Sequence, residues 1–191
     1  MATRKGPWDA LFAIAVIQEG LFSAAQAKQA GCSQQLLGRY LATGKVERVT
    51  RALYRIVHFP RGESEDLLAL WLWSKQEGVF SHETALFLHQ LSDALPSVAH
   101  LTLPTKWLRR VVKRPGRLIV FYDDLSAEDR AWHGPVPVTS VRRTLADCLH
   151  ANVSADLVAQ ASMHAAERGL IHSAEVISAP AIGLWRHRAH T

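Results

Sequence analysis

The sequence predicts an α+β chain of two domains, residues 1–62 and 63–191, and three observations support this organisation. The first is a helical pattern interrupted by glycines and followed by a short strand pair before residue 62. The second is the linker PRGES at residues 60–64, rich in Pro, Gly and polar residues. The third is a mixture of strands and helices beyond the linker that does not alternate strictly, which is typical of α+β domains.

Three helices are predicted before the strand pair. Pro7 begins an apolar first helix, and Ser23 caps a second helix that runs through Ala30. Gly31 supplies the left-handed residue of a tight turn, and Ser33 caps the third helix. A small residue four positions before the turn and apolar residues six and nine positions after it complete the spacing of a helix-turn-helix.

The third predicted helix has one apolar and one polar face. Leu37, Tyr40 and Leu41 lie at i, i+3 and i+4 in GCSQQLLGRYLATG, so we expect them to be buried. The residues left on the opposite face are Gln34, Gln35, Gly38 and Arg39. Gln can pair with adenine and Arg with guanine in the major groove, which favours base reading by Gln34, Gln35 and Arg39. The alternative is a helical hairpin with a polar outer face.

Residues 45–56, KVERVTRALYRI, predict a two-stranded hairpin, which we call the wing. A basic hairpin directly behind a recognition helix can reach phosphates or a minor groove. The predicted phosphate and wing contacts are Ser33, Thr43, Lys45, Arg48, Thr50 and Arg51. A first helix, a helix-turn-helix and a basic wing together predict a winged helix that binds double-stranded DNA.

The positive charge of the chain is concentrated in the first domain. Residues 1–62 hold nine Lys or Arg against three Asp or Glu, a net +6, whereas residues 63–191 hold thirteen against fourteen, a net −1. This asymmetry is expected of a segment that meets a polyanion. The alternative is a solvated basic face that keeps the chain in solution.

Four stretches resemble the AbiEi-type antitoxins, the regulatory half of bacterial type IV toxin–antitoxin systems. They are the opening helix with GCSQQLLGRYLATG, the wing KVERVTRALYRI, SHETALFLHQLSDALP (residues 81–96) and VTSVRRTLADCL (residues 138–149). Two positions depart from the family pattern: Ala52 and Gln90 stand where the family commonly has Gly. The Ala52 difference predicts a tighter or shifted turn in the wing.

The resemblance implies a winged helix followed by an antitoxin domain. It also implies repression of the protein's own toxin operon at inverted repeats in the promoter, and neutralisation of a nucleotidyltransferase-like toxin, in general without a stable complex. We expect a dimer or two cooperating monomers on DNA, since helix-turn-helix proteins read half-sites about 34 Å apart. The other interpretations are a stand-alone winged-helix regulator and the DNA-binding module of a small nuclease.

The second domain is predicted to hold strands near residues 100–103, 118–122 and 136–139 and helices near 64–77, 141–149 and 154–168, together with a helix capped by Ser81. Residues 105–117, TKWLRRVVKRPGR, contain no acid, and we call them the basic segment. Its cations, the candidate antitoxin surface, are Lys106, Arg109, Arg110, Lys113, Arg114 and Arg117. The alternative is a solvated face opposed by the acids at 123, 124, 128 and 129.

The sequence gives little evidence for catalysis, a bound cofactor, a metal site or a membrane-spanning segment. No nucleophile elbow, P-loop or dinucleotide glycine pattern is present, and adjacent Asp123 and Asp124 would point to opposite faces of a strand. His82 and His89 are seven apart, not at the i, i+4 spacing of a zinc pair. The two cysteines form no framework, and the longest apolar runs are too short to cross a bilayer. We therefore expect a cytoplasmic protein that is not an enzyme.

Overall fold

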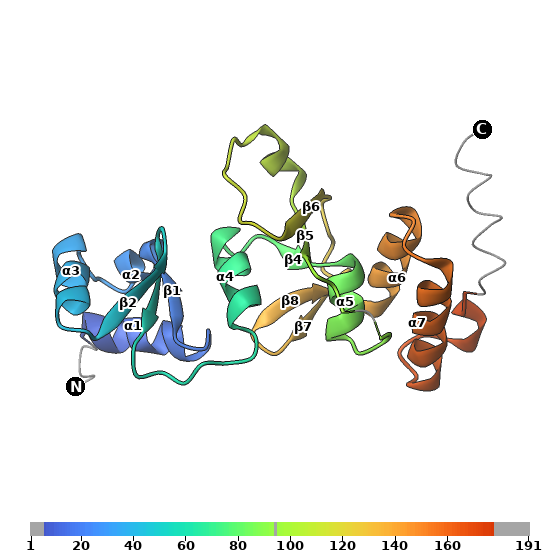
Figure 1. The fold of residues 1–191 in the computed structure, drawn as a ribbon, viewed down its shortest axis with the longest axis horizontal. Helices are drawn as coiled ribbons and strands as arrows, with labels where there is room; N and C mark the ends of the chain where they lie inside the picture. The colour runs from blue at the N-terminus through green and yellow to red at the C-terminus, as the bar shows by residue number, and fades with distance from the viewer. Residues whose placement is uncertain (1–5, 94, 178–191) are drawn as a thin grey trace. The chain divides into compact units, whose positions relative to one another are not determined.

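The computed structural model describes residues 6–93 and 95–177 and confirms the predicted α+β class. Arg4 and Lys5, two of the nine cations counted above, lie outside the described residues. The chain divides into two compact units, one reaching to Gln76 and including Gly134–Val136, the other formed by Glu77–His133 and residues from Pro137 onward. Figure 1 shows the order of the elements. No helix of the described part is long and apolar enough to cross a membrane.

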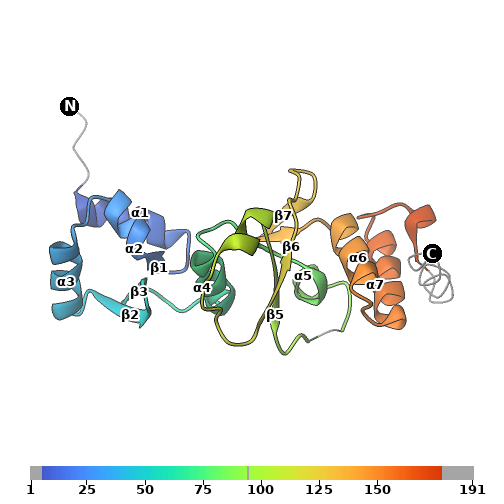
Figure 2. The same ribbon diagram turned by 90° about the horizontal axis from the view of Figure 1, so that it is seen from above.

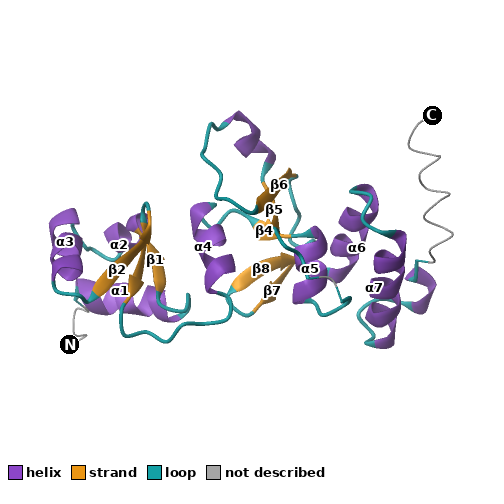
Figure 3. Ribbon diagram, viewed as in Figure 1, coloured by secondary structure: helices purple, strands orange, loops and turns teal. Residues whose placement is uncertain are grey.

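The first unit contains a small antiparallel sheet with three helices around it, followed by a fourth helix (Figure 3). Its helices are α1 (Pro7–Val16), α2 (Ala24–Gln29), α3 (Gln34–Ala42) and α4 (Glu65–Trp73). Its strands, in the spatial order β1-β3-β2, are β1 (Leu21–Ser23), β3 (Leu53–Ile56) and β2 (Val46–Thr50). Strand β1 was not predicted, and it completes the sheet by pairing Phe22 with Tyr54. The arrangement is the predicted winged helix.

Local capping chemistry determines where the helices begin and end. Pro7 occupies the first turn of α1. The Ser23 hydroxyl accepts the Gln26 N–H at 3.2 Å and the Gln26 side chain accepts the Ser23 N–H at 2.8 Å, a capping box that begins α2. Gly31 has φ +83°, the left-handed conformation that the turn into α3 requires. These positions agree with the sequence prediction.

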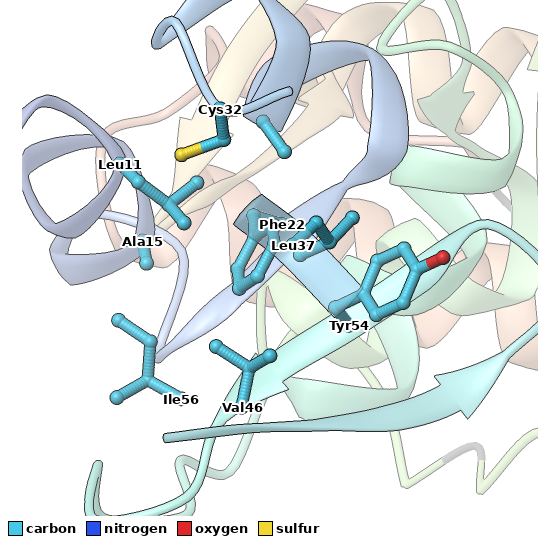
Figure 4. Packing of buried hydrophobic residues seen from close by; sticks show 9 residues of the cluster. Leu11, Ala15, Phe22, Cys32, Leu37, Val46, Tyr54 and Ile56 are labelled. Atoms are coloured by element: carbon cyan, nitrogen blue, oxygen red, sulfur yellow. The ribbon is translucent and has the colours of Figure 1, made fainter. Parts of the chain in front are cut away.

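One apolar cluster holds the winged helix together (Figure 4). Its buried members are Leu11, Ala15, Phe22, Ala27, Cys32, Leu37, Val46, Tyr54 and Ile56. Phe22 and Tyr54 stack with ring centroids 5.7 Å apart, so that β1 and β3 contribute to the same core as the helices. Tyr40 and Leu41 pack against the cluster from outside and are partly buried. The predicted inner face of α3 is therefore the face that packs.

The first unit extends through α4. Arg55 of β3 is 2% exposed, and its guanidinium donates to the Glu65 carboxylate at 2.5 Å and to the Phe59 carbonyl at 2.8 Å. Glu65 begins α4, so this ion pair attaches the helix to the wing strand. The predicted boundary between residues 62 and 63 precedes α4, whereas the division into compact units follows it.

Residues 77–177 carry a five-stranded mixed sheet in the order β6-β5-β4-β8-β7. The strands are β4 (Val79–Phe80), β5 (Ala99–Leu103), β6 (Leu118–Tyr122), β7 (Arg130–His133) and β8 (Val136–Thr139). The helices are α5 (His82–Leu88), α6 (Val141–His150), α7 (Ala155–Glu167) and the short 3-10 helices η1 (Thr105–Arg109) and η2 (Ser173–Glu175). The predicted strands correspond to β5, β6 and β8, while β4 and β7 were missed.

Helices α6 and α7 lie side by side, as Figures 1 and 2 show from two directions. They share a second apolar cluster with the end of α5, which includes the buried residues Leu86, Leu145, Cys148 and Val158. Strand β5 pairs parallel with β6 and antiparallel with β4, and β4 pairs parallel with β8. Strand β6 therefore lies at one edge of the sheet.

Candidate nucleic-acid interface

Helix α3 presents a polar face while its opposite face is anchored in the core. Leu37 is 7% exposed within the apolar cluster, and Tyr40 meets the Trp8 ring edge-on with centroids 4.9 Å apart. Gln34, Gln35 and Arg39 are exposed. The structure thus places all three predicted base-reading side chains on the outer face, where hydrogen bonding to base edges is chemically feasible.

Gly38 lies on the same outer face and has no structural reason to be glycine. A Cβ added there would meet nothing within 4 Å, and its φ is not left-handed. Glycine inside a helix costs about 1 kcal/mol relative to alanine. Gly38 therefore lowers the stability of α3 at the centre of its polar face. Glycine is the residue expected at such a position where another molecule approaches the backbone closely.

Two predicted phosphate contacts also stabilise the ends of α3. The Ser33 hydroxyl accepts the Leu36 N–H at 3.1 Å, which caps the start of the helix. The Thr43 hydroxyl donates to the Arg39 carbonyl at 2.9 Å at its end. Both side chains are exposed, so each oxygen has room for a further partner.

The wing directs several polar side chains into solvent. Arg48, Thr50 and Arg51 are exposed, and the Arg48 guanidinium lies over the Tyr54 ring at 5.6 Å. The Lys45 ammonium lies 5.2 Å from the Trp8 ring centroid, which fixes its position close to the start of the wing.

A backbone hydrogen bond holds the tip of the wing against the start of α2. The Ala52 carbonyl accepts the Ala24 N–H at 2.9 Å, which attaches the tip to the start of α2. Ala52 has φ +63°, and the strand register shifts between Arg48 and Thr50. The turn at the position where the family commonly has glycine is thus left-handed although its residue is alanine.

Arg55, one of the nine cations counted in residues 1–62, does not belong to this surface. Arg55 is buried and engages Glu65 and Glu47, at 2.5 and 3.9 Å. Sequence reasoning counted it with the exposed charges, because a long-range ion pair leaves no local signal. The cations that α3 and the wing expose are Arg39, Lys45, Arg48 and Arg51.

Comparison with known proteins agrees with the resemblance. Residues 9–57 match the family model of the AbiEi antitoxin transcriptional regulators. The matched segment begins within α1 and ends just after β3, so it contains α3 and the whole wing. The stretches at residues 81–96 and 138–149 lie outside it.

Two further comparisons concern the whole chain. Among solved structures, the Rv2827c protein of Mycobacterium tuberculosis is similar, with 13% sequence identity and a TM-score of 0.47 over 86% of this chain and 73% of that one. No curated protein matches the chain.

The basic segment lies beyond the AbiEi-matched residues, between β5 and β6. Lys106 forms an ion pair with Glu77, and the Arg110 guanidinium lies 3.6 Å from the same carboxylate and 4.5 Å from the Trp107 ring centroid. The hydrogen bond from Lys106 lowers the pKa of Glu77 below its ordinary value. Two of the six candidate cations are therefore held by an acid that sequence reasoning did not consider.

Among the described residues, the acids expected to oppose the basic segment form no ion pair with its cations. Asp124 accepts the Thr105 N–H at 3.0 Å and the Thr105 hydroxyl at 2.5 Å. Asp123 and Asp129 both engage Arg143, the latter at 3.6 Å. Among the described residues, Arg109, Arg114 and Arg117 form no ion pair. The basic segment thus keeps part of its positive charge uncompensated.

Arg143 lies at the centre of a cluster of three carboxylates, those of Asp123, Asp129 and Asp147. Asp147, one helical turn further along α6, accepts its Nε–H at 2.7 Å, and Asp123 and Asp129 contact its other nitrogens. The cluster was missed by sequence reasoning, although the i, i+4 spacing of Arg143 and Asp147 is a visible signal. A guanidinium occupies the position among the carboxylates, and the described residues contain no group of three ligands suited to a metal.

His82 begins α5 and His89 follows its last residue, and the two side chains contact different groups. The His82 ring stacks on Phe121 with centroids 3.6 Å apart and its Nδ1 lies 2.9 Å from the Ser81 hydroxyl. His89 Nε2 lies 2.7 Å from the Thr139 carbonyl oxygen. Burial lowers the pKa of His82 to about 4, with His100 and Arg143 adding to the effect. Both side chains take part in packing.

Proposed function

We propose that this protein is a DNA-binding transcriptional autorepressor and antitoxin of a bacterial type IV toxin–antitoxin operon, acting in the cytoplasm against a nucleotidyltransferase-like toxin. The observation that carries the proposal is the exposed row Gln34, Gln35 and Arg39 on a helix anchored by Leu37, within the segment that matches the AbiEi regulators. Inverted repeats in its own promoter are the proposed target. A dimer or two cooperating monomers would occupy the two half-sites.

In this proposal the residues of the interface have two roles. Gln34, Gln35 and Arg39 read base edges in the major groove, because amide and guanidinium groups can form paired hydrogen bonds with purines. The phosphate contacts come from Ser33, Thr43, Lys45, Arg48, Thr50 and Arg51. They position α3 and contribute affinity that does not depend on sequence.

Substitution of Arg39 by alanine tests base reading. Arg39→Ala should weaken binding to the promoter duplex by about 1–3 kcal/mol and relax the preference at one base pair, as measured by fluorescence anisotropy with promoter variants. Arg61→Ala is the matched control, since it removes the same charge from an exposed position outside α3 and the wing. An equal loss on promoter and shuffled duplexes would argue against base reading.

The wing is tested by salt dependence. Arg51→Ala should weaken binding to all duplexes alike and reduce the slope of log K against log salt by about one. A slope that equals that of the unaltered protein would remove the tip of the wing from the interface.

The antitoxin role is proposed to depend on the second unit through the basic segment. Charge reversal of Arg109, Arg114 and Arg117, the cations without an ion pair in the described structure, should reduce rescue when the protein is co-expressed with its toxin. Charge reversal of Arg61 is the control. Full rescue by the triple variant would assign the antitoxin activity to another surface.

A further inference from the structure

Strand β6 offers an unpaired edge for another strand. It is the terminal strand in the order β6-β5-β4-β8-β7, and no strand among the described residues pairs with its outer side. The Ala99 N–H donates to the Arg117 carbonyl and the Asp123 N–H to the Leu103 carbonyl, so the odd-numbered residues of this strand bond to β5. The N–H and C=O groups of Leu118, Val120 and Tyr122 therefore point away from the sheet.

The strand lacks the features that normally protect an edge. Proteins blunt exposed edges with charges, proline or bulges within the strand. Residues 118–122 read LIVFY, without any of these, and Ile119 is 43% exposed. An apolar edge of this kind favours pairing with another chain.

Positive charge surrounds this edge. The Arg114 guanidinium donates to the Tyr122 hydroxyl at 3.1 Å, which brings it beside the last residue of β6, and Arg117 immediately precedes the strand. Neither forms an ion pair among the described residues. Figure 3 shows the basic segment extending away from the sheet between β5 and β6, where Leu108 and Val111 are exposed.

We propose that an extended segment of a protein partner, with alternating acidic and apolar residues, adds to β6 as a sixth strand. Main-chain hydrogen bonds to Leu118, Val120 and Tyr122 would supply the pairing, and acidic side chains would meet Arg114 and Arg117. The proposal deepens the antitoxin surface suggested above and rests on it for the partner's biological role. It does not depend on DNA binding.

Charge and side-chain type favour this occupant over two others. A second copy paired edge to edge would bring the same arginines together, and like charges across an interface are unfavourable. Single-stranded nucleic acid is bound by aromatic side chains on which bases stack. The exposed apolar residues of the basic segment are aliphatic, and its one aromatic residue, Trp107, is buried.

The probe is a capped, labelled peptide of about seven residues with alternating Glu and Val, titrated into the full-length protein. We expect saturable binding by anisotropy, together with slower hydrogen exchange at the Val120 and Tyr122 amides. The same peptide N-methylated at alternate residues should bind at least about tenfold more weakly, because it cannot donate along one edge. A peptide of alternating Lys and Val should not bind.

Protein variants separate the charge from the backbone contribution. Reversal of Arg114 and Arg117 to Glu should weaken peptide binding at least about tenfold, whereas Arg61→Glu should leave it unchanged. Val120→Pro removes one outward donor at a position where an edge strand tolerates proline, and Val120→Thr retains it. Of these two Val120 variants, only Val120→Pro is expected to lose peptide binding. The N-methylated peptide tests the same point with the protein unaltered.

Four results would overturn strand addition. Equal binding of the N-methylated peptide would show that the main chain is not involved. Displacement of the peptide by an RNA of equal charge that protects the basic segment and not β6 would assign the surface to nucleic acid. Protection of the β6 amides that rises with protein concentration alone would identify a second copy as the occupant. If charge reversal abolishes toxin rescue while the peptide fails to bind, the antitoxin surface stands and strand addition is wrong.

Discussion

Replacement of Gly38 by alanine should change stability and DNA binding in opposite directions. The added methyl group meets no protein atom within 4 Å, so no clash opposes it. Alanine is more favourable than glycine in a helix interior by about 0.8–1.0 kcal/mol, and the first unit should become more stable by that amount. The methyl group would project from the polar face between the base-reading side chains, so a duplex that approaches the α3 backbone would be displaced.

Native-state hydrogen exchange of the β3 amides measures the stability of this unit without assuming that both units unfold together. Anisotropy with the promoter duplex measures affinity. Gly116→Ala is the matched control, since a Cβ there also meets nothing within 4 Å and the residue lies in the basic segment. Affinity unchanged by Gly38→Ala, with the expected gain in stability, would refute close approach of DNA to α3.

Three further predictions concern strain and buried charge. Ala52→Gly should stabilise the first unit by about 0.5–1 kcal/mol in the same exchange measurement, since a left-handed alanine costs more than the chain entropy of glycine. The unfolded state takes up a proton on His82 below pH 6.5 but the folded state only near its pKa of about 4, so His82 should account for about 3 kcal/mol of the stability lost in urea denaturation as the pH falls through this range. Burial also lowers the pKa values of His89 and His100, so His82→Asn should reduce that loss without abolishing it. Arg143→Leu should destabilise the second unit by about 3 kcal/mol in urea denaturation at neutral pH, because it leaves the buried Asp147 carboxylate without its partner. The loss should be smaller in acid, because burial raises the pKa of Asp147 and its carboxyl is then protonated. Arg142→Leu is the control and should cost under about 1 kcal/mol.

The features that sequence reasoning predicted are those whose causes are local. Ser23, Gly31 and Ser33 each act within a few residues of themselves, through a side-chain cap or a left-handed backbone. The spacing of Leu37 and Tyr40 depends only on the period of one helix. The outer face of α3 followed from these positions, because the residues that remain must point away from the core.

The features that were missed depend on residues distant in the sequence. Strand β1 is three residues long and is a strand only because β3 pairs with it. Glu65 fixes Arg55 across ten positions, and Glu77, in the loop before β4, meets Lys106. A charge count treats each of these cations as free, so it overestimates the positive surface that DNA or a partner would meet.

Ala52 and Gln90, the two departures from the family pattern, both lie in left-handed turns. Gln90 follows the last turn of α5 with φ +55°, and the Leu91 N–H donates to the Leu86 carbonyl at 3.0 Å, as in a glycine-terminated helix. Ala52 likewise keeps a left-handed φ at the tip of the wing. In both places the backbone is left-handed although the residue is not glycine, which adopts this conformation most easily. The hydrogen bonds and packing around each turn therefore specify its shape, and they offset a cost of about 1–2 kcal/mol at each position.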